Sequence, residues 1–209
     1  MPTNNHTDTE QAILNAAEEV FLNKGFAMAK TVDIAKLAGV NQALLHYYFR
    51  TKDNLFEAVF AHKVQSVIST VFEVLGKDIP LMEKIRMQVE LQFDFLLSNP
   101  KVPFLIISEI ARVPQRVENI KQVVGKHVQQ IIEKLQAELD EAHREGKIRK
   151  ISALNLLVNM LSQNVLLFLV YPIFQSFTNM SDSDLKKFIA NRKQENVTCV
   201  LNSLKADES

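Results

Sequence analysis

Apolar residues recur at helical spacing along almost the whole chain, and alternating strand-like runs are nearly absent. One set of residues, at i, i+3, i+4, i+7 and i+8, forms the apolar face of a first helix: Ile13, Ala16, Ala17, Val20 and Phe21. Thr7 and Glu10 have the spacing of a capping box at the start of this helix, and Gly25 provides a stop at its end. The pattern predicts an all-α protein.

The same spacing predicts about nine helices in all. After the first, they cover approximately residues 31–37, 42–49, 53–75, 80–97, 103–111, 115–145, 152–177 and 184–205. Pro80 suits the first position of its helix, and Ser181 with Asp184 has capping-box spacing. The composition changes inside the helix that begins near Asp53, so we expect an N-terminal domain of residues 1–60 and a second domain of residues 61–209.

Two short helices joined by a turn that contains glycine predict a helix-turn-helix, whose second helix enters the major groove of DNA. The residue types around this turn fit that geometry. Ala35 and Ala38 are small enough for two helices to cross closely, and Gly39 tolerates the backbone of the turn. Val40 is expected to fill the core beneath.

This region resembles the DNA-binding signature of TetR-family transcription regulators. The resemblance is carried by residues 33–40, 45–49 and 52–55, with Gly25-Phe26 at the family's distance before them. It covers roughly residues 8–60, and the remainder matches the family only in length and helix count. The resemblance implies an N-terminal three-helix helix-turn-helix domain and a C-terminal helical domain for ligand binding and dimerisation.

The resemblance also assigns roles within the motif. Phosphate contacts fall to Lys30, Thr31, Tyr47, Tyr48 and Lys52, and base-edge contacts fall to Gln42, Ala43 and His46. The side-chain chemistry agrees: glutamine can pair with adenine and alanine can touch a thymine methyl, while hydroxyls and a lysine near a helix start suit phosphate oxygens. Aromatic residues on a helix are more often core, which we expect of Phe49, and a lone histidine such as His46 is often an ordinary surface residue.

Some positions depart from the family pattern. Ala29 stands where a hydroxyl residue is usual, Leu44 where a small polar residue is frequent, and His46 where tyrosine is frequent. These differences leave the operator sequence open and do not change the expected binding mode.

Charge and cysteine content add little about partners but bear on location. The 209 residues carry 24 basic and 24 acidic side chains, although residues 34–52 contain three basic residues and no acid. The single cysteine, Cys199, excludes an internal disulfide, and the polar N-terminus lacks the apolar run of a signal peptide. An uncharged stretch between Lys150 and Asp182 is interrupted by polar residues and by proline, so we interpret it as a buried helix. A cytoplasmic protein is expected.

The last two predicted helices have apolar faces to cover. In the family the corresponding helices pair with their copies in a second subunit, so a homodimer is expected; the alternative is that they complete the core of one subunit. The candidate residues for a small-molecule pocket are Gln92, Phe93, Phe104, Ile107, Glu109, Asn164, Phe168 and Tyr171. Such a lining would suit an apolar or amphipathic effector.

No glycine-rich phosphate loop, HExxH motif or Cys/His cluster occurs, so we expect no catalysis, cofactor or metal. The leading hypothesis is a repressor that binds a double-stranded DNA operator and is released by a small-molecule effector. The alternative is a helical small-molecule binding or carrier protein without DNA binding, in which the first three helices are only structural.

Overall fold

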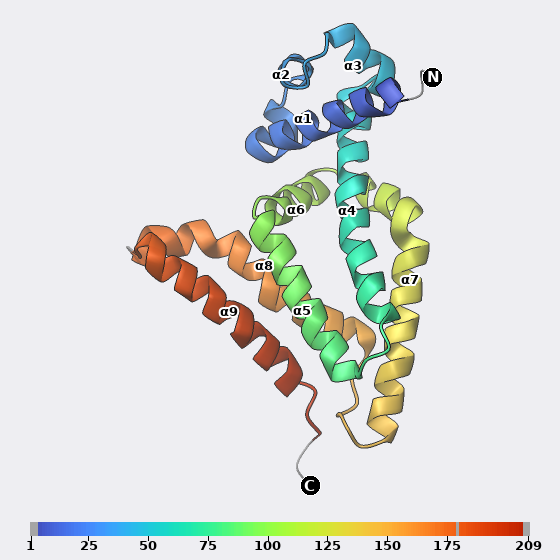
Figure 1. Ribbon diagram of the computed structural model, residues 1–209, viewed down its shortest axis with the longest axis vertical. Helices are drawn as coiled ribbons and strands as arrows, with labels where there is room; N and C mark the ends of the chain where they lie inside the picture. Colours follow the sequence, from blue (N-terminus) through green and yellow to red (C-terminus); the bar gives the residue numbers. More distant parts are fainter. Residues whose placement is uncertain (1–3, 179, 207–209) are drawn as a thin grey trace. The chain divides into compact units, whose positions relative to one another are not determined.

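The computed structural model describes residues 4–178 and 180–206; for residues 4–6, 64, 66–73, 75–76, 119–120, 123–124, 171–172, 175 and 182 it describes the backbone alone. Every regular element in these ranges is a helix (Figure 1). The helices are α1 (Asn4–Met28), α2 (Thr31–Leu37), α3 (Gln42–Phe49), α4 (Lys52–Gly76), α5 (Leu81–Ser98), α6 (Val102–Arg112), α7 (Gln115–Arg144), α8 (Ala153–Thr178) and α9 (Asp182–Asn202). The all-α prediction is confirmed, and each predicted helix has its counterpart.

Four of the predicted helix ends are informative. Gly25 has φ +68°, which interrupts the helical geometry near the end of α1 as expected. Ser181 caps α9 by accepting a hydrogen bond from the backbone N–H of Asp184, also as expected. The capping box at Thr7 is wrong, because α1 begins at Asn4 and Thr7 lies inside the helix. Pro80 is the N-cap of α5 rather than its first residue.

The chain forms two compact units. The first comprises Met1–Ser66 and Phe104–Val123, and the second comprises Val67–Pro103 and Val124–Ser209. Helices α4 and α7 each contribute to both units. The first unit therefore contains the predicted helix-turn-helix together with a segment that comes from much later in the chain. The assignment of separate functions to residues 1–60 and 61–209 stays a prediction.

The core of the first unit is aromatic. The rings of Phe21 and Phe26 each meet the ring of Phe56 edge-on, with centroids 5.1 Å apart in both pairs. Leu45 of α3 and Leu105 of α6 belong to the same buried cluster. Because α3 is anchored in this cluster, its orientation depends on the helices that surround it.

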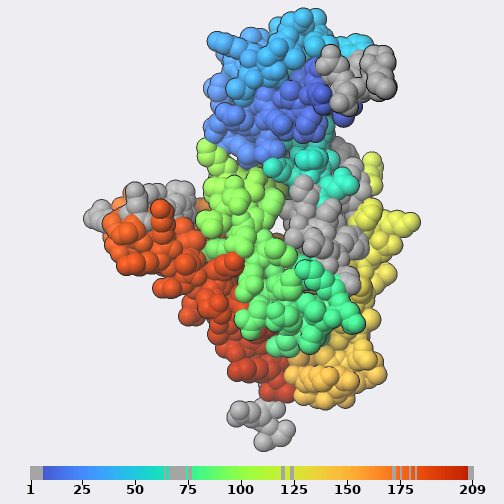
Figure 2. Space-filling view, viewed as in Figure 1, coloured from blue at the N-terminus to red at the C-terminus, as the bar shows by residue number. Residues whose placement is uncertain are grey.

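In the second unit, α5 packs against both α8 and α9. Figure 2 shows α9 lying along α5. Leu139, Leu156 and Leu204 are fully buried in its core. Helix α8 differs from its neighbours because it carries large apolar side chains on its exposed side as well: Leu154, Val158, Leu161, Leu166, Ile173, Phe174 and Phe177. Residues 153–170 are long and apolar enough to span a membrane by length and composition alone, and 28% of this stretch is buried. The expected burial of α8 is therefore incomplete within one chain.

Candidate nucleic-acid interface

The turn between α2 and α3 has the geometry that the sequence predicted. Gly39 has φ +69°, a backbone conformation that residues with a Cβ rarely adopt. Ala35 is buried, and Val40 packs against the same apolar cluster. Asn41 then caps α3, because its side-chain oxygen accepts a hydrogen bond of 2.8 Å from the backbone N–H of Leu44. These contacts fix where α3 begins.

Helix α3 has one buried face and one exposed face. Leu45 and Phe49, four residues apart, are buried in the core of the first unit. The residues assigned to base edges, Gln42, Ala43 and His46, are all exposed. Tyr47 lies beside them with 69% of its surface exposed. The structure thus brings the base-reading candidates together on a single solvent-facing surface.

The ring orientation of His46 is set by its own helix. Its Nδ1 lies 2.9 Å from the backbone oxygen of Arg50. Because a carbonyl oxygen only accepts hydrogen bonds, Nδ1 must carry the proton, and in the neutral ring Nε2 is left as an acceptor. His46 is therefore prepared to accept a hydrogen bond from a base amino group.

Several of the phosphate candidates lie at the edge of this surface. Lys30 is exposed at the N-cap of α2, while Thr31 is partly buried and 3.4 Å from Nε2 of Gln42. Tyr48 is partly buried, with its ring edge-to-face against Tyr47 at a centroid distance of 5.5 Å. Their predicted contacts are compatible with these positions and stay predictions.

Helix α2 is tied to α1 by an ion pair of 2.7 Å between Nζ of Lys24 and Asp33. The hydrogen bond from Lys24 lowers the pKa of Asp33 from its usual 3.8, and nearby lysines act in the same direction. Since the folded-state pKa is the lower one, this contribution to stability is present above the unfolded pKa and is lost as the pH falls through the folded value. The pair therefore supports α2 throughout the neutral range.

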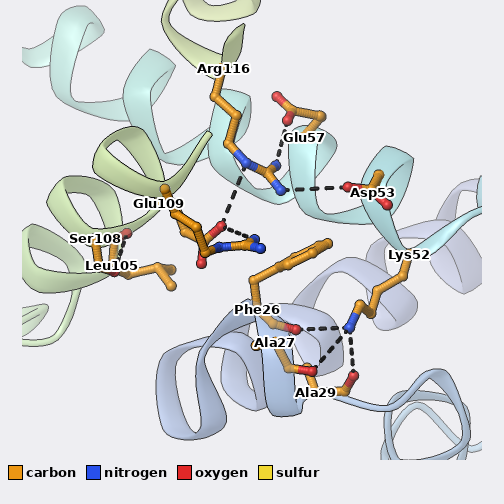
Figure 3. Close-up of polar contacts among 11 residues, drawn as sticks. Phe26, Ala27, Ala29, Lys52, Asp53, Glu57, Leu105, Ser108, Glu109 and Arg116 are labelled. Carbon is orange, nitrogen blue, oxygen red and sulfur yellow. Dashed lines mark hydrogen bonds and ion pairs between the residues drawn. The ribbon is translucent and has the colours of Figure 1, made fainter. Parts of the chain in front are cut away.

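Lys52 occupies a different environment from the one the sequence suggested. Its ammonium donates to the backbone oxygens of Phe26 (2.9 Å), Ala29 (3.1 Å) and Ala27 (3.4 Å), as Figure 3 shows. It also lies 4.4 Å from the centre of the Phe26 ring. This arrangement joins the start of α4 to the end of α1 and favours a structural role. The predicted phosphate contact of Lys52 stays untested.

The candidate effector residues fall into two groups. Gln92, Phe93, Asn164 and Phe168 lie in the second unit, where Asn164 donates to Gln92 (2.8 Å) and the rings of Phe93 and Phe168 are 5.5 Å apart. Phe104, Ile107 and Glu109 belong to the first unit; the two apolar side chains are exposed and the carboxylate is buried in ion pairs. The side chain of Tyr171 lies outside the described residues.

A small apolar cavity of about 20 Å³ lies in the second unit between α5, α7 and α8. Its lining residues are Lys84, Ile85, Gln88, Ile131, Leu135, Leu156, Leu157 and Met160. None of the predicted effector residues is among them. Most of this lining has the sequence signature of ordinary core. The polar members, Lys84 and Gln88, are the signal that could have indicated the site, and the ammonium of Lys84 donates to Glu138 at 3.0 Å.

The described side chains contain no group of three or more histidine, cysteine or acidic residues arranged to hold a metal ion. The chemistry that the exposed face of α3 offers is hydrogen bonding and apolar contact.

Comparison with known proteins finds relatives both for the region of the helix-turn-helix and for most of the chain. Residues 13–59 match the family model described as "Bacterial regulatory proteins, tetR family". The transcriptional activator FasR of Mycolicibacterium smegmatis is 34% identical over 84 residues, which are 40% of this chain and 38% of that protein. The nucleoid occlusion factor SlmA of Aliivibrio fischeri (strain MJ11) is 26% identical over 187 residues, 89% of this chain and 90% of that protein.

Among solved structures, the fatty acid degradation regulator FadR of Bacillus halodurans is similar, with a TM-score of 0.67 and 18% identity. The superposition covers 95% of this chain and 97% of that one. At this identity the likeness shows that both chains share a fold.

Proposed function

Because the chain is a DNA-binding transcriptional regulator of the tetR family, we propose that it is a homodimeric repressor that leaves its operator when a small apolar or amphipathic molecule binds. The observation that supports this most directly is the exposed face of α3. Its polar residues point outward from a helix that is anchored by Leu45 and Phe49 and follows a glycine turn. A helix held in this way suits insertion into the major groove.

The proposed contacts divide into two classes. Gln42, Ala43 and His46 read base edges, and Nε2 of His46 accepts from an adenine or cytosine amino group. Lys30 and the hydroxyls of Thr31, Tyr47 and Tyr48 hold phosphates beside the groove.

Dimerisation rests on the apolar surface of α8. Val158 and Leu161 are about half exposed, and a soluble chain normally covers a continuous apolar face of this kind. Pairing with the same face of a second copy gives two-fold symmetry and places two recognition helices over half-sites about 34 Å apart. The alternative, that α8 only completes the core of one subunit, is disfavoured by these exposed side chains.

The effector is proposed to enter at the cavity between α5, α7 and α8. The cavity has room for about one water molecule, so a ligand must displace apolar side chains from their present positions. Oε1 of Gln88, one of the lining residues, is buried without a hydrogen-bond partner. The apolar chain of a ligand would suit the apolar lining of the cavity, and one hydrogen-bond donor on the ligand would pair with Oε1 of Gln88. The likeness to a fatty acid degradation regulator favours acyl compounds as effectors.

Regulation of transcription implies a cytoplasmic protein that acts by binding and not by catalysis.

Selection of bound duplexes from a random DNA pool tests this function. We expect enrichment of a palindrome whose half-sites are about one helical turn apart, and loss of preference at one base pair per half-site for Gln42→Ala. A second arm titrates saturated fatty amides of increasing length, whose N–H can donate to Oε1 of Gln88, into the complex and follows the release of DNA. No enriched sequence even at low salt would contradict DNA binding, and no release at any length would contradict the acyl effector.

A further inference from the structure

Arg116, in the first turn of α7, has a buried side chain that lies against the end of α1 and the start of α4 (Figure 3). Only 3% of this side chain is exposed. Its guanidinium donates to the carboxylate of Glu57 at 2.5 Å and lies 3.5 Å from that of Asp53, both in the first turns of α4. On the other side, its Nε is 3.5 Å from Glu109 of α6 without forming a hydrogen bond. All of these residues belong to the first compact unit.

The guanidinium also stacks on two aromatic rings of the core. Its centre lies 4.6 Å from the ring of Phe26 and 4.3 Å from the ring of Phe56. Phe26 also receives the cations of Lys52 at 4.4 Å and Arg112 at 5.0 Å. A planar guanidinium can stack and form directed hydrogen bonds at the same time, which a lysine ammonium cannot.

The charges around Arg116 are balanced. Three cations, Lys52, Arg112 and Arg116, face three carboxylates: Asp53, Glu57 and Glu109. Without Arg116, Glu57 would lose its hydrogen-bonded cation and Asp53 would lose its ion-pair partner. Water can partly replace the cation at these two carboxylates, whose side chains are 29% and 69% exposed, but Glu109 is 7% exposed and would be left with Arg112 alone.

The cluster is connected to the recognition helix through the backbone. Arg116 fixes Phe26 at the end of α1, and Lys52 holds the carbonyls of residues 26, 27 and 29 immediately before α2 begins at Thr31. The start of α4, which Arg116 holds through Asp53 and Glu57, directly follows the end of α3. A change at Arg116 therefore reaches both ends of the helix-turn-helix.

We propose that Arg116 is a positioning residue for DNA recognition: it makes residues 104–123 part of the DNA-binding body and holds α2 and α3 at the angle that the operator requires. This inference rests on the proposed DNA binding. Arg116 faces the protein interior, so it acts through Phe26, Asp53 and Glu57 and does not itself contact DNA. The same segment is continuous with the part of α7 that lines the cavity through Ile131 and Leu135.

The test compares the full-length protein with Arg116→Gln, Arg116→Lys and Lys121→Gln. Lys121 is a matched control on the same helix; its side chain is 71% exposed and, among the described side chains, forms a surface pair with Glu118. Each variant is titrated against the duplex selected by the wild type, first at stoichiometric concentration to count active protein and then at low concentration for affinity. The titration is repeated across salt concentrations.

For Arg116→Gln we expect roughly tenfold weaker operator affinity of the active fraction, with the salt dependence of binding unchanged, because no phosphate contact is lost. Arg116→Lys keeps the charge but not the stacking and directed hydrogen bonds, so it should recover affinity only in part. Lys121→Gln should equal the wild type.

Wild-type affinity in a fully active Arg116→Gln protein would overturn the proposal. So would a reduced salt dependence, which would make Arg116 a contact residue, or a loss confined to the active fraction, which would make its role purely structural. If Arg116→Gln does not fold, Arg116→Lys decides by the same criteria. A wild type that binds no duplex would instead refute the proposed function.

Discussion

At the residue scale, the two lysines that the sequence assigned to DNA phosphates, Lys30 and Lys52, have different environments. Lys30 is exposed at the N-cap of α2, whereas the ammonium of Lys52 is bound by backbone carbonyls of residues 26, 27 and 29. A lysine in the second situation stabilises the fold, and only the first has its charge turned to solvent.

We predict that Lys52→Met lowers the free energy of unfolding by about 1.5–3 kcal/mol, because charge-assisted hydrogen bonds to the backbone are lost. Lys30→Met should leave stability within about 0.5 kcal/mol of the wild type but weaken operator binding and reduce its salt slope by about 1. Urea denaturation and binding titrations at several salt concentrations measure the two effects. Equal stability of both variants would assign Lys52 to the DNA surface after all.

Some residue-scale features could be predicted from the sequence, and others could not. The exposed face of α3 was predictable, because helical period and the family motif both place Gln42, Ala43 and His46 on one side. The positive φ of Arg50, +57°, was not predictable from the residue type, since such angles favour glycine. The burial of Arg116 was equally hidden, because its partner Glu57 is 59 residues away in the chain.

At the element scale, helices α5, α8 and α9 are joined by a buried amide network. Asn164 is completely buried; its amide donates to the backbone oxygen of Val89 (3.0 Å) and to Gln92, and its oxygen accepts from Asn196 (2.9 Å). The sequence suggested Asn164 and Gln92 as anchors for a ligand. Their side chains are instead engaged with each other and with the backbone.

We expect Asn164→Leu to destabilise the protein by about 1–3 kcal/mol for each polar group that it leaves buried and unpaired. The matched control is Asn155→Leu, an exposed position on the same helix, which should stay within about 0.5 kcal/mol of the wild type. Chemical denaturation followed by circular dichroism gives both values. If Asn164→Leu had the same free energy of unfolding as the control, the network would have no structural importance. A ligand role for Asn164 would then regain support.

The helix boundaries were easier to predict than the contacts between helices. Caps such as Ser181 and breaks such as Gly25 depend on neighbours in sequence, which the chain displays directly. The cavity next to Gln88 depends on side chains from three helices, and apolar spacing alone does not distinguish a cavity wall from filled core.

At the scale of the whole molecule, the apolar surface of α8 links solubility to assembly. Val158 and Leu161 are 52% and 47% exposed in the single chain. If this surface is the contact between two copies, the dimer should be required both for solubility and for reading two half-sites at once.

We predict that Val158→Glu with Leu161→Glu produces a folded monomer that binds a single half-site only weakly. Sedimentation velocity measures the mass, and the operator titration measures the affinity. A charge added on another helix, as in Gln130→Glu at an exposed position of α7, should leave the wild-type mass unchanged. A double variant that still sediments as a dimer would place the contact elsewhere.

The first compact unit is assembled from two stretches of chain, residues 1–66 and 104–123, and this affects the order of events during synthesis. On the ribosome, α1 to α3 emerge long before Arg116 does. Until Arg116 has been synthesised, Asp53 and Glu57 at the start of α4 lack the cation with which they pair in the folded protein. A regulator built in this way can bind its operator tightly only after more than half of its chain has been translated. Fragments that end before α7 would therefore compete poorly with the full-length protein for the operator.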